Sequence, residues 1–378
     1  MKPLKILHVA GARPNFMKVA PIIAALAGRD GAFEQRLVHT GQHYDENMSQ
    51  VFFDQLGLPR PDVDLGVGSG SHAVQTARIM ERFEPLVVDH APDWVVVVGD
   101  VNSTLACSLV SAKLGIRVAH VEAGLRSFDR TMPEELNRIL TDQLSDLLFT
   151  PSTDCHDNLA REGIAADKVH FVGNVMIDTL LRLLPRTAPA AARLLEDLAT
   201  DRRVARTPAL PEDEYVLVTL HRPGNVDDPV PLREIIGALT DLSADRLVLF
   251  PVHPRTRQRI ATEGISVDRE RLVLIDPVGY LEFVGLMQKA ALVLTDSGGI
   301  QEETTVLGVP CLTVRPNTER PITITEGTNR LVACDRRALV KTARTALAAP
   351  PPEGHRPEGW DGRAAERIAD VLEGTGGR

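Results

Sequence analysis

The stretch Trp94-Val95-Val96-Val97-Val98, which runs into Gly99-Asp100, decides the fold class. A run that is apolar at every position is typical of a strand buried on both faces, as in a parallel sheet covered by helices on each side. Further short apolar runs alternate with helical patterns, at residues 5–10, 35–40, 117–121, 147–150, 169–172, 215–220, 246–251, 272–275, 292–295 and 311–314. This alternation predicts a doubly wound α/β fold.

The chain has 378 residues, more than one hydrophobic core usually supports, so two domains are expected. The candidate strands form two series, separated by a helical stretch rich in Ala, Arg and Leu. We place the linker near residues 173–178, take 180–199 as the first helix of the second domain, and predict a closing helix at 364–372. Two similar domains, 1–173 and 174–361, are expected to face each other across a cleft. Ligands of such sheets bind beyond the carboxyl ends of the strands.

The composition is that of an ordinary globular protein, with 43% hydrophobic and 25% charged residues. The net charge of −9 argues against nonspecific binding to nucleic acid. The N-terminus lacks the pattern of a signal peptide, and the apolar runs are shorter than the roughly 18–20 residues that a membrane span requires. The four cysteines, at positions 107, 155, 311 and 334, are scattered and form no zinc-ligand pattern. We therefore expect a cytoplasmic enzyme or binding protein, with no metal and no membrane partner.

Carboxylates occur at the carboxyl ends of neighbouring predicted strands. Asp100 ends one strand, and Glu122 ends the next, within His120-Val121-Glu122-Ala123-Gly124-Leu125-Arg126. Glu134 and Glu135 follow Pro133, which suits the first position of a helix. Asp100 is equally suited to capping the next helix, and both glutamates suit the positive end of a helix dipole. Proton transfer is the other role, for which Glu134 is preferred. Glu135 is assigned a surface or inter-helix role.

Two strand–helix turns are suited to binding an anion. In Gly11-Ala12-Arg13-Pro14-Asn15-Phe16-Met17-Lys18, the glycine permits a tight turn before a helix, and Arg13 and Lys18 add positive charge. In Thr295-Asp296-Ser297-Gly298-Gly299, the two glycines allow backbone amides to approach a phosphate, and Ser297 adds a hydroxyl. Neither turn has a GxGxxG or Walker pattern, and Ser297 lacks the GxSxG context of a nucleophile. A plain strand–helix turn is the alternative for the first segment.

Further polar residues follow the strands of the second series. His221 and Arg222 leave a strand into a Pro-Gly-Asn loop, where they would face solvent and suit phosphate binding or charge stabilisation at a leaving group. His253 repeats this position on the next strand and is assigned a structural role. Glu303, one turn into a helix, is placed to accept hydrogen bonds from ribose hydroxyls, and Arg320 to reach a phosphate.

The order of these blocks resembles that of the non-hydrolysing UDP-N-acetylglucosamine 2-epimerases. The resemblance spans residues 6–332 and is carried by segments 11–18, 99–100, 120–126, 133–138, 221–223, 295–303 and 318–321. It implies a GT-B-type architecture, in which two Rossmann-like, doubly wound parallel-sheet domains face a central cleft. It also implies that the final helix, 362–376, crosses back to the first domain, and that the protein is a homodimer with a UDP-sugar substrate.

The resemblance further implies reversible epimerisation at C2, between UDP-GlcNAc and UDP-ManNAc, without NAD or a metal. In this family the reaction proceeds by anti elimination of UDP to 2-acetamidoglucal and syn re-addition of UDP. The matching motifs give Asp100, Glu122 and Glu134 as catalytic acids and His221 as the catalytic histidine. The expected substrate contacts are Arg13, Lys18, Arg126, Arg222, Phe283 (near the uracil), Ser297, Gly298, Gly299, Glu303 and Arg320.

Three segments depart from the enterobacterial type of this family. The segment between Glu122 and Pro133 is shorter, and Val278 replaces a glutamine near the base. Residues 40–48 differ from the segment that holds a second, activating UDP-GlcNAc in some bacterial members. Shorter-loop relatives act on UDP sugars with acetamido groups at C2 and C3 and a carboxylate at C6, so a C2 epimerase of such a UDP-2,3-diacetamido sugar is one alternative. A GT-B glycosyltransferase, built on the same scaffold, is another, and a hydrolysing epimerase and a silent sugar-nucleotide sensor are less favoured.

Overall fold

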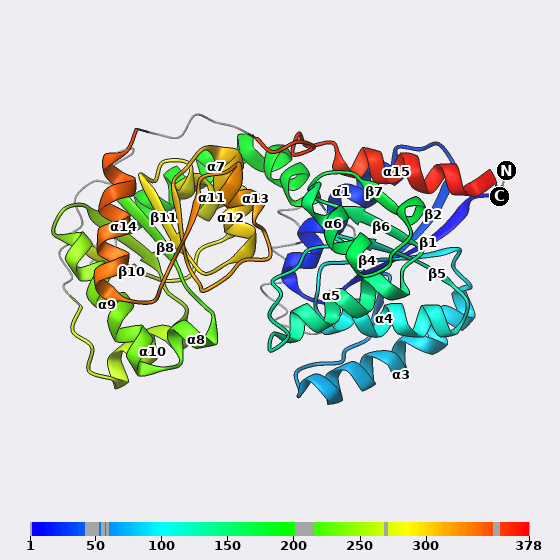
Figure 1. Ribbon diagram of the computed structural model, residues 1–378, viewed down its shortest axis with the longest axis horizontal. Helices are drawn as coiled ribbons and strands as arrows, with labels where there is room; N and C mark the ends of the chain where they lie inside the picture. Colours follow the sequence, from blue (N-terminus) through cyan, green and yellow to red (C-terminus); the bar gives the residue numbers. More distant parts are fainter. Residues whose placement is uncertain are drawn as a thin grey trace. The chain divides into compact units, whose positions relative to one another are not determined.

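The computed structural model of the chain describes residues 2–41, 53, 57, 60–200, 215–267, 271–350 and 356–377. The chain forms two units, one of residues 1–182 with 358–378 and one of residues 183–357. Each unit contains a parallel sheet flanked by helices (Figure 1). The prediction of two α/β domains with parallel sheets is confirmed.

The sheet of the N-terminal unit has seven parallel strands in the order β3-β2-β1-β4-β5-β6-β7. The strands are β1 (Leu4–Ala10), β2 (Phe33–His39), β3 (Val63–Asp64), β4 (Trp94–Val98), β5 (Arg117–Val121), β6 (Leu147–Thr150) and β7 (Val169–Phe171). The central strand β4 is buried along its whole length. Because β1, β4 and β5 are parallel neighbours, the loops that follow them leave the same edge of the sheet side by side.

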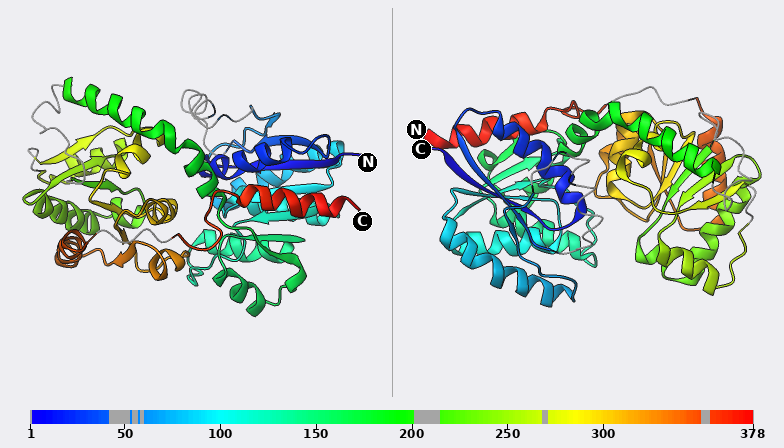
Figure 2. Two further views of the ribbon diagram at one scale, coloured as in Figure 1. Left: turned by 90° about the horizontal axis from the view of Figure 1, so that it is seen from above. Right: turned by 180° about the vertical axis from the view of Figure 1, so that it is seen from behind.

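Helices cover both faces of this sheet (Figures 1 and 2). On one face, α3 (His72–His90) and α4 (Asn102–Lys113) contribute apolar side chains to a core shared with β1 and β4, and α5 (Pro133–Leu144) lies beside α4. On the other face, α1 (Arg13–Ala27) packs against the last helix, α15 (Ala364–Gly374). The described part of this unit also contains α6 (Asp154–Arg161) and the 3-10 helices η1 (Ala166–Lys168) and η2 (Thr375–Gly377).

The sheet of the C-terminal unit has six parallel strands in the order β10-β9-β8-β11-β12-β13. They are β8 (Tyr215–Thr219), β9 (Leu247–Pro251), β10 (Leu272–Ile275), β11 (Leu292–Thr295), β12 (Cys311–Val314) and β13 (Asn329–Val332). The helices are α8 (Pro223–Val226), α9 (Pro229–Ser243), α10 (Pro254–Thr262), α11 (Tyr280–Met287), α12 (Gly298–Leu307), α13 (Ile322–Thr325) and α14 (Arg336–Ala348). Apolar side chains of α9 and α14 pack on this sheet in one core cluster.

The long helix α7 (Val175–Thr200) runs from one unit into the other. The linker expected near residues 173–178 is therefore mostly helical, and the helix starts before the predicted residue 180. Asp178 in its first turn accepts hydrogen bonds from the two leading N–H groups of α15, at 3.1 and 2.7 Å. Burial raises the pKa of Asp178 to about 6, although these N–H groups act in the opposite direction. The contacts keep the first turns of α7 in the N-terminal unit, which extends to residue 182.

Two edge strands have no counterpart in the sequence prediction. β3 has only two residues, and β13 reads Asn-Arg-Leu-Val, so neither shows an apolar run or a sustained alternation. Neighbouring strands supply their hydrogen-bond partners, β2 for β3 and β12 for β13. Among the helices that the structure describes, none is both long enough and apolar enough to cross a membrane.

Candidate active site

In the N-terminal unit, predicted residues from the loops after β1 and β5 lie in contact. Lys18 of α1 donates from Nζ to Oε2 of Glu122 at 2.5 Å, and both side chains are buried. Asn15 of the same helix donates to the carbonyl oxygen of Val98 at 3.0 Å and so ties α1 to β4. Arg13, the first residue of α1, is exposed. The first of the two turns predicted to bind an anion and one predicted catalytic acid thus lie together in the N-terminal unit.

The backbone around the Lys18–Glu122 ion pair has a left-handed conformation at two residues. Glu122, which is 4% exposed, has φ of 70°, and Gly99 at the end of β4 has φ of 69°. The left-handed conformation costs a residue other than glycine roughly 1–2 kcal/mol. At Gly99 a Cβ atom would also lie 3.0 Å from Lys18 Nζ, so a side chain would crowd the buried ion pair. Conformational strain of this kind is concentrated at functional sites, which favours a functional role for Glu122.

Asp100 is held by two residues of α5. Its carboxylate accepts a hydrogen bond from the buried Arg138 guanidinium, and its backbone carbonyl oxygen accepts one from Asn137 Nδ2 at 2.9 Å. The helix-capping alternative is wrong, because α4 begins after Val101 and has no side-chain cap. The Asp100 side chain is 29% exposed, so part of its carboxylate remains accessible to a ligand.

The neighbouring glutamates of α5 have opposite environments. Glu134 is exposed, whereas Glu135 is 1% exposed, so the expectation of a surface position for Glu135 is wrong. The Glu135 carboxylate accepts hydrogen bonds from the N–H groups of Ser127 and Phe128 at 3.0 and 2.8 Å, and from the Arg138 guanidinium at 2.7 and 3.0 Å. Burial acts to raise its pKa, but these donors bring the pKa below its ordinary value. Glu135 therefore fixes the short loop that precedes α5.

Arg126, which is predicted to contact the substrate, is bound by carboxylates of its own unit. Its guanidinium is 2% exposed and donates to Asp142 at 2.7 Å, to Glu162 at 2.6 and 2.8 Å, and to the Leu125 carbonyl oxygen. Burial acts to lower the pKa of Arg126, but the two carboxylates raise it overall. This side chain is committed to the interior of the N-terminal unit because its buried carboxylate partner requires a cation.

In the C-terminal unit, Asp296 organises the loop that carries His221 and Arg222. The carboxylate of Asp296 is fully buried and accepts from the N–H groups of His221 at 3.1 Å and Arg222 at 2.9 Å, and from Asn225 Nδ2 at 3.0 Å. The His221 ring keeps its Nδ1 atom 3.3 Å from Asp296, yet the side chain is 60% exposed. The histidine is therefore oriented by a buried acid and presented outward, as predicted for a residue at the carboxyl end of β8.

The Ser-Gly-Gly turn after β11 lies against Arg320. Ser297 is the N-cap residue of α12 and Gly298 its first residue. A Cβ atom on Gly298 would lie 2.6 Å from Arg320 Nη1, so the close approach of the guanidinium requires glycine there. Arg320 donates to Glu302 at 2.6 Å and also to Glu319, and it is 7% exposed. The turn thus combines a helix N-terminus with a cation that two carboxylates hold in place, and Gly299 follows in the same helical turn.

Glu303 and Tyr280 form a buried pair in the same unit. The Tyr280 hydroxyl, at the start of α11, donates to Glu303 Oε1 at 2.7 Å. Burial raises the pKa of Glu303 to about 7, with a smaller contribution from the charge of Glu302. Phe283, on the same helix as Tyr280, is half-buried. His253 accepts a hydrogen bond from the Arg255 N–H at the start of α10, which agrees with the structural role predicted for it.

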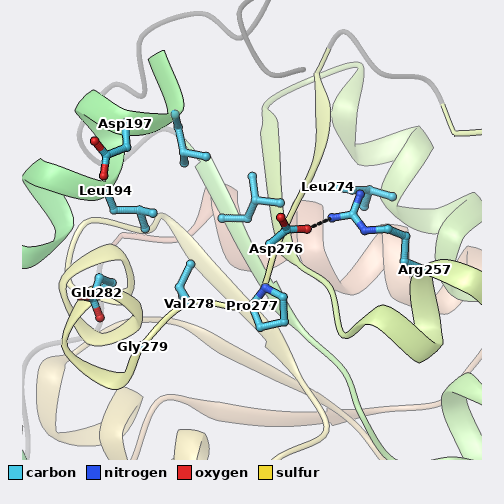
Figure 3. A pocket seen from close by; sticks show the side chains of 11 residues that line it. Leu194, Asp197, Arg257, Leu274, Asp276, Pro277, Val278, Gly279 and Glu282 are labelled. Carbon is cyan, nitrogen blue, oxygen red and sulfur yellow. Dashed lines mark hydrogen bonds and ion pairs between the residues drawn. The ribbon is translucent and has the colours of Figure 1, made fainter. Parts of the chain in front are cut away.

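A pocket of about 390 Å³ lies beside the loop between β10 and α11 (Figure 3). Leu194 of α7 and Val278 line it with apolar atoms, and Glu282 adds a carboxylate. Arg257 lies at its edge, paired with Asp276 at 3.2 Å. The pocket therefore includes the position predicted to lie near the base, but not the Ser-Gly-Gly turn.

Comparison with known proteins shows the family of the chain. Residues 25–373 match the model of a family described as UDP-N-acetylglucosamine 2-epimerase. The chain belongs to this family. As a member it is an enzyme, an epimerase among the isomerases, and the resemblance found in its sequence motifs is confirmed.

Relatives of this epimerase match it over nearly its full length. The UDP-N-acetylglucosamine 2-epimerase of Methanocaldococcus jannaschii is 40% identical, over 98% of this chain and 99% of the relative. The UDP-2,3-diacetamido-2,3-dideoxy-D-glucuronate 2-epimerase of Pseudomonas aeruginosa is 43% identical, with the same coverage. A crystal structure of the M. jannaschii enzyme in complex with UDP-GlcNAc and UDP superposes with a TM-score of 0.86 at 39% identity, and covers 98% of this chain and 99% of that one. The GT-B-type fold class is confirmed by this similarity.

The structure of the epimerase also identifies residues that the sequence did not single out. Arg138, Asp142, Asp296 and Tyr280 are buried or half-buried partners of predicted site residues. The buried His120 contacts Asp142 in turn. Each of these residues acts through a contact that is made only in the folded state, which the sequence does not show. Of segment 40–48, in which a second substrate site was considered, residues 42–48 lie outside the described part of the chain.

Proposed function

We propose that the enzyme catalyses the reversible inversion of C2 in a UDP-2-acetamido sugar, with UDP-GlcNAc and UDP-ManNAc as the two epimers. The observation that carries this proposal is the full-length similarity to relatives that bear this activity in their names. The described geometry supports it, because three carboxylates and a cluster of cations occur on loops at the carboxyl ends of parallel strands, where ligands of such sheets bind. The family match favours this reaction over the glycosyltransferase alternative.

In the proposed reaction a carboxylate removes the proton from C2 while the bond between C1 and the diphosphate oxygen breaks. The electrons of the C–H bond form the C1–C2 double bond of 2-acetamidoglucal, and UDP leaves with the electrons of the C1–O bond on the side opposite to the departing proton. The same UDP oxygen then adds back to C1, and a proton is delivered to the other face of C2. Atoms and charges balance without an oxidant, so neither NAD nor a metal is needed for this sequence of steps.

We assign the proton transfers to Asp100, Glu122 and Glu134. Asp100 is partly exposed beside a buried arginine, Glu134 is exposed on the first turn of α5, and Glu122 is buried against the Lys18 ammonium. A carboxylate that can approach the reacting carbon can take up or deliver a proton in either direction of the reaction. The sequence of the family and these environments support the assignment, and the variants described below test it.

We assign the binding of the departing diphosphate to cations and to a helix N-terminus. His221, Arg222 and Arg13 present positive charge or hydrogen-bond donors, and stabilisation of a leaving group by preorganised donors is often the largest contribution to catalysis. The other proposed contacts are Lys18, Ser297, Gly298, Gly299 and Arg320. Glu303 is proposed to accept from the ribose hydroxyls and Phe283 to lie near the uracil. Arg126 is left out, since its guanidinium is held by Asp142 and Glu162.

A second candidate substrate is a UDP-2,3-diacetamido sugar with a carboxylate at C6. The observation that favours it is the 43% identity to the P. aeruginosa relative named for such a substrate, against 40% to the M. jannaschii relative. The reaction at C2 is the same for both sugars, because neither the second acetamido group nor the C6 carboxylate takes part in it. Comparison of kcat/KM for the two substrates decides between them.

The central experiment follows the reaction by NMR in D2O. UDP-GlcNAc should equilibrate with UDP-ManNAc, and deuterium should enter at C2 of both epimers, because the proton lost from C2 exchanges with solvent. The proposal fails if folded enzyme converts neither of the two candidate sugars, UDP-GlcNAc and the diacetamido sugar, and if no deuterium enters at C2 of either. Free UDP and free sugar as the main products would instead identify a hydrolysing epimerase. Light scattering tests the accompanying proposal of a homodimer.

A further inference from the structure

His120 is a fully buried histidine whose two ring nitrogens both have partners. It precedes Val121 and Glu122 on β5, and none of its surface is exposed. Nδ1 lies 2.6 Å from the Asp142 carboxylate, and Nε2 lies 2.8 Å from the carbonyl oxygen of Gly99. With no exposed atom, the ring cannot touch a substrate, so any effect that it has on the reaction must pass through these partners.

Both partners of the ring accept hydrogen bonds. A backbone carbonyl oxygen can only accept, and Asp142 is a carboxylate whose pKa is lowered by His120 and Arg126 against the opposing effect of burial. Two acceptors of this kind are satisfied together only when each ring nitrogen carries a hydrogen, as in an imidazolium. The local charges agree with this protonation state, since Asp142 and Glu162 supply two negative charges, and Arg126 and a protonated His120 supply two positive charges.

Two neighbouring residues of β5, His120 and Val121, hold the N–H group and the carbonyl group of Gly99. The Gly99 N–H donates to the Val121 carbonyl oxygen at 3.0 Å, and the Gly99 carbonyl oxygen accepts from His120. Gly99 has φ of 69°, where a glycine without such contacts would be free to adopt many conformations. Because the carbonyl group of Gly99 belongs to the peptide that leads into Asp100, its orientation sets the direction in which Asp100 leaves the sheet.

We propose that His120 is a positioning residue for the epimerisation, which as an imidazolium between Asp142 and the Gly99 carbonyl fixes the peptide that presents Asp100. The inference deepens the proposed function and rests on the role given there to Asp100. It identifies a buried residue that contributes to turnover without contact to substrate. We call the two contacts of the His120 ring, to Asp142 and to the Gly99 carbonyl oxygen, the His120 clamp. A misplacement of a reacting group by about 1 Å can cost on the order of 100-fold in rate, so loss of the clamp should lower kcat measurably.

Two variants separate the clamp from the fold. In His120→Asn the side-chain amide replaces Nδ1 and can still donate to Asp142, but nothing reaches Gly99. In His120→Gln the amide replaces Nε2 and can still donate to Gly99, but the bond to Asp142 is lost. Both variants lose the same positive charge and each loses one of the two contacts, so the difference between them reports which contact, to Gly99 or to Asp142, carries the effect on turnover. Thermal melting and UDP binding by calorimetry show for each variant that the protein is folded.

The clamp predicts unequal losses in the two variants. We expect kcat to fall about 100-fold in His120→Asn and less than about 10-fold in His120→Gln, with KM within about threefold of the wild-type value in both. Equal losses of kcat that follow the loss of melting temperature would show that the ring only supports the fold, and would overturn the proposal. Unchanged kcat in His120→Asn would overturn it as well.

NMR keeps this test independent of the reaction. In wild-type protein labelled with 15N-histidine, both ring nitrogens of His120 should have the shifts of protonated nitrogens, and the signal is assigned by its absence in the variants. The backbone amide signal of Asp100 should move in His120→Asn and stay in place in His120→Gln. A neutral ring would refute the clamp, and so would an Asp100 amide signal with the same chemical shift in both variants as in the wild-type protein. If the wild-type enzyme failed to label C2, the proposed function would fail, and these signals would still decide on the clamp.

Discussion

Lys18 and Glu122 form a buried ion pair, with 2.5 Å between Nζ and Oε2 and side chains that are 9% and 3% exposed. The pair joins the helix after β1 to the end of β5, although β4 lies between these two strands in the sheet. Two segments that each carry a predicted site residue are thus linked by a charge contact between positions that are 104 apart in the chain. Such a pair is sensitive to the loss of one partner, because the other is then left charged in a buried place.

Replacing either partner alone should therefore destabilise the protein more than replacing both. We expect Lys18→Met to lower the free energy of unfolding by about 3–5 kcal/mol, and the double variant Lys18→Met/Glu122→Gln to recover at least about 1 kcal/mol of this loss. Urea unfolding of the two single variants and the double variant gives the coupling energy. Additive losses would mean that the pair contributes no coupling. Turnover should be low in Glu122→Gln and in the double variant if Glu122 transfers a proton.

Asp100→Asn tests the partly exposed acid. The amide can still accept a hydrogen bond from Arg138, so the melting temperature and the affinity for UDP should stay close to the wild-type values. Turnover should fall by about 10²–10⁴-fold, since an amide cannot take up or deliver the proton. The measurement is the rate of deuterium entry at C2. A near-normal rate in this variant would remove Asp100 from the proton transfers.

The strands of both sheets were predictable because their signal is local. Runs such as Trp94–Val98 are apolar at every position, and burial on both faces of a parallel sheet is the physical cause. β3 and β13 escaped prediction because they are short and polar, and exist only through pairing with a neighbouring strand. Much of the candidate site was also predictable, since loops at the carboxyl ends of parallel strands converge.

The roles of the buried charges were not predictable in the same way. Arg126 and Glu162 are 36 residues apart in the chain, and no pattern in either segment predicts their contact. Glu135 and Glu134 have the same chemistry and adjacent positions, yet only the packing of α5 decides which one is buried. Motif matching supplies the residue types of a site, whereas the partner of each charge follows from tertiary structure.

Glu303 should give the stability of the protein a dependence on pH. Its pKa is about 7 in the folded protein against an ordinary value of 4.5, so the folded state binds more protons between these values. Stability should therefore fall as pH rises through this window, by on the order of 3 kcal/mol for this group. Glu303→Gln should remove that part of the slope in urea unfolding series. Asp178, with a pKa of about 6, contributes a similar slope that begins at lower pH and remains in the variant.

Arg126→Met tests whether Arg126 stabilises the fold through Asp142 and Glu162 instead of binding the substrate. Loss of the guanidinium leaves the buried Asp142 without one of its cations, so the free energy of unfolding should fall by about 3–5 kcal/mol. The affinity for UDP, measured by calorimetry on the folded fraction, should not change. Arg130→Met is the control, because Arg130 is exposed and its loss should cost less than about 0.5 kcal/mol. Weaker UDP binding without loss of stability would return Arg126 to the substrate contacts.

The adjacent residues Glu134 and Glu135 allow the same substitution to be made in two environments. Glu135→Gln should lower the free energy of unfolding by about 1–3 kcal/mol, because the carboxylate accepts from Ser127, Phe128 and Arg138, and an amide has only one accepting atom. Glu134→Gln should change stability by less than about 0.5 kcal/mol, since this side chain is exposed.

Turnover should respond to Glu134→Gln far more than stability does. If Glu134 transfers a proton, the variant should lose about 10²–10⁴-fold in the rate of deuterium entry at C2, with unchanged UDP binding. Glu135→Gln should lose turnover only to the extent that the loop of residues 127–132 loosens, so its kcat should recover at lower temperature, where the loop is better ordered. The reverse pattern, with stability lost at Glu134 and turnover lost at Glu135, would exchange the two roles and make the buried Glu135, instead of the exposed Glu134, the proton carrier in the first turn of α5.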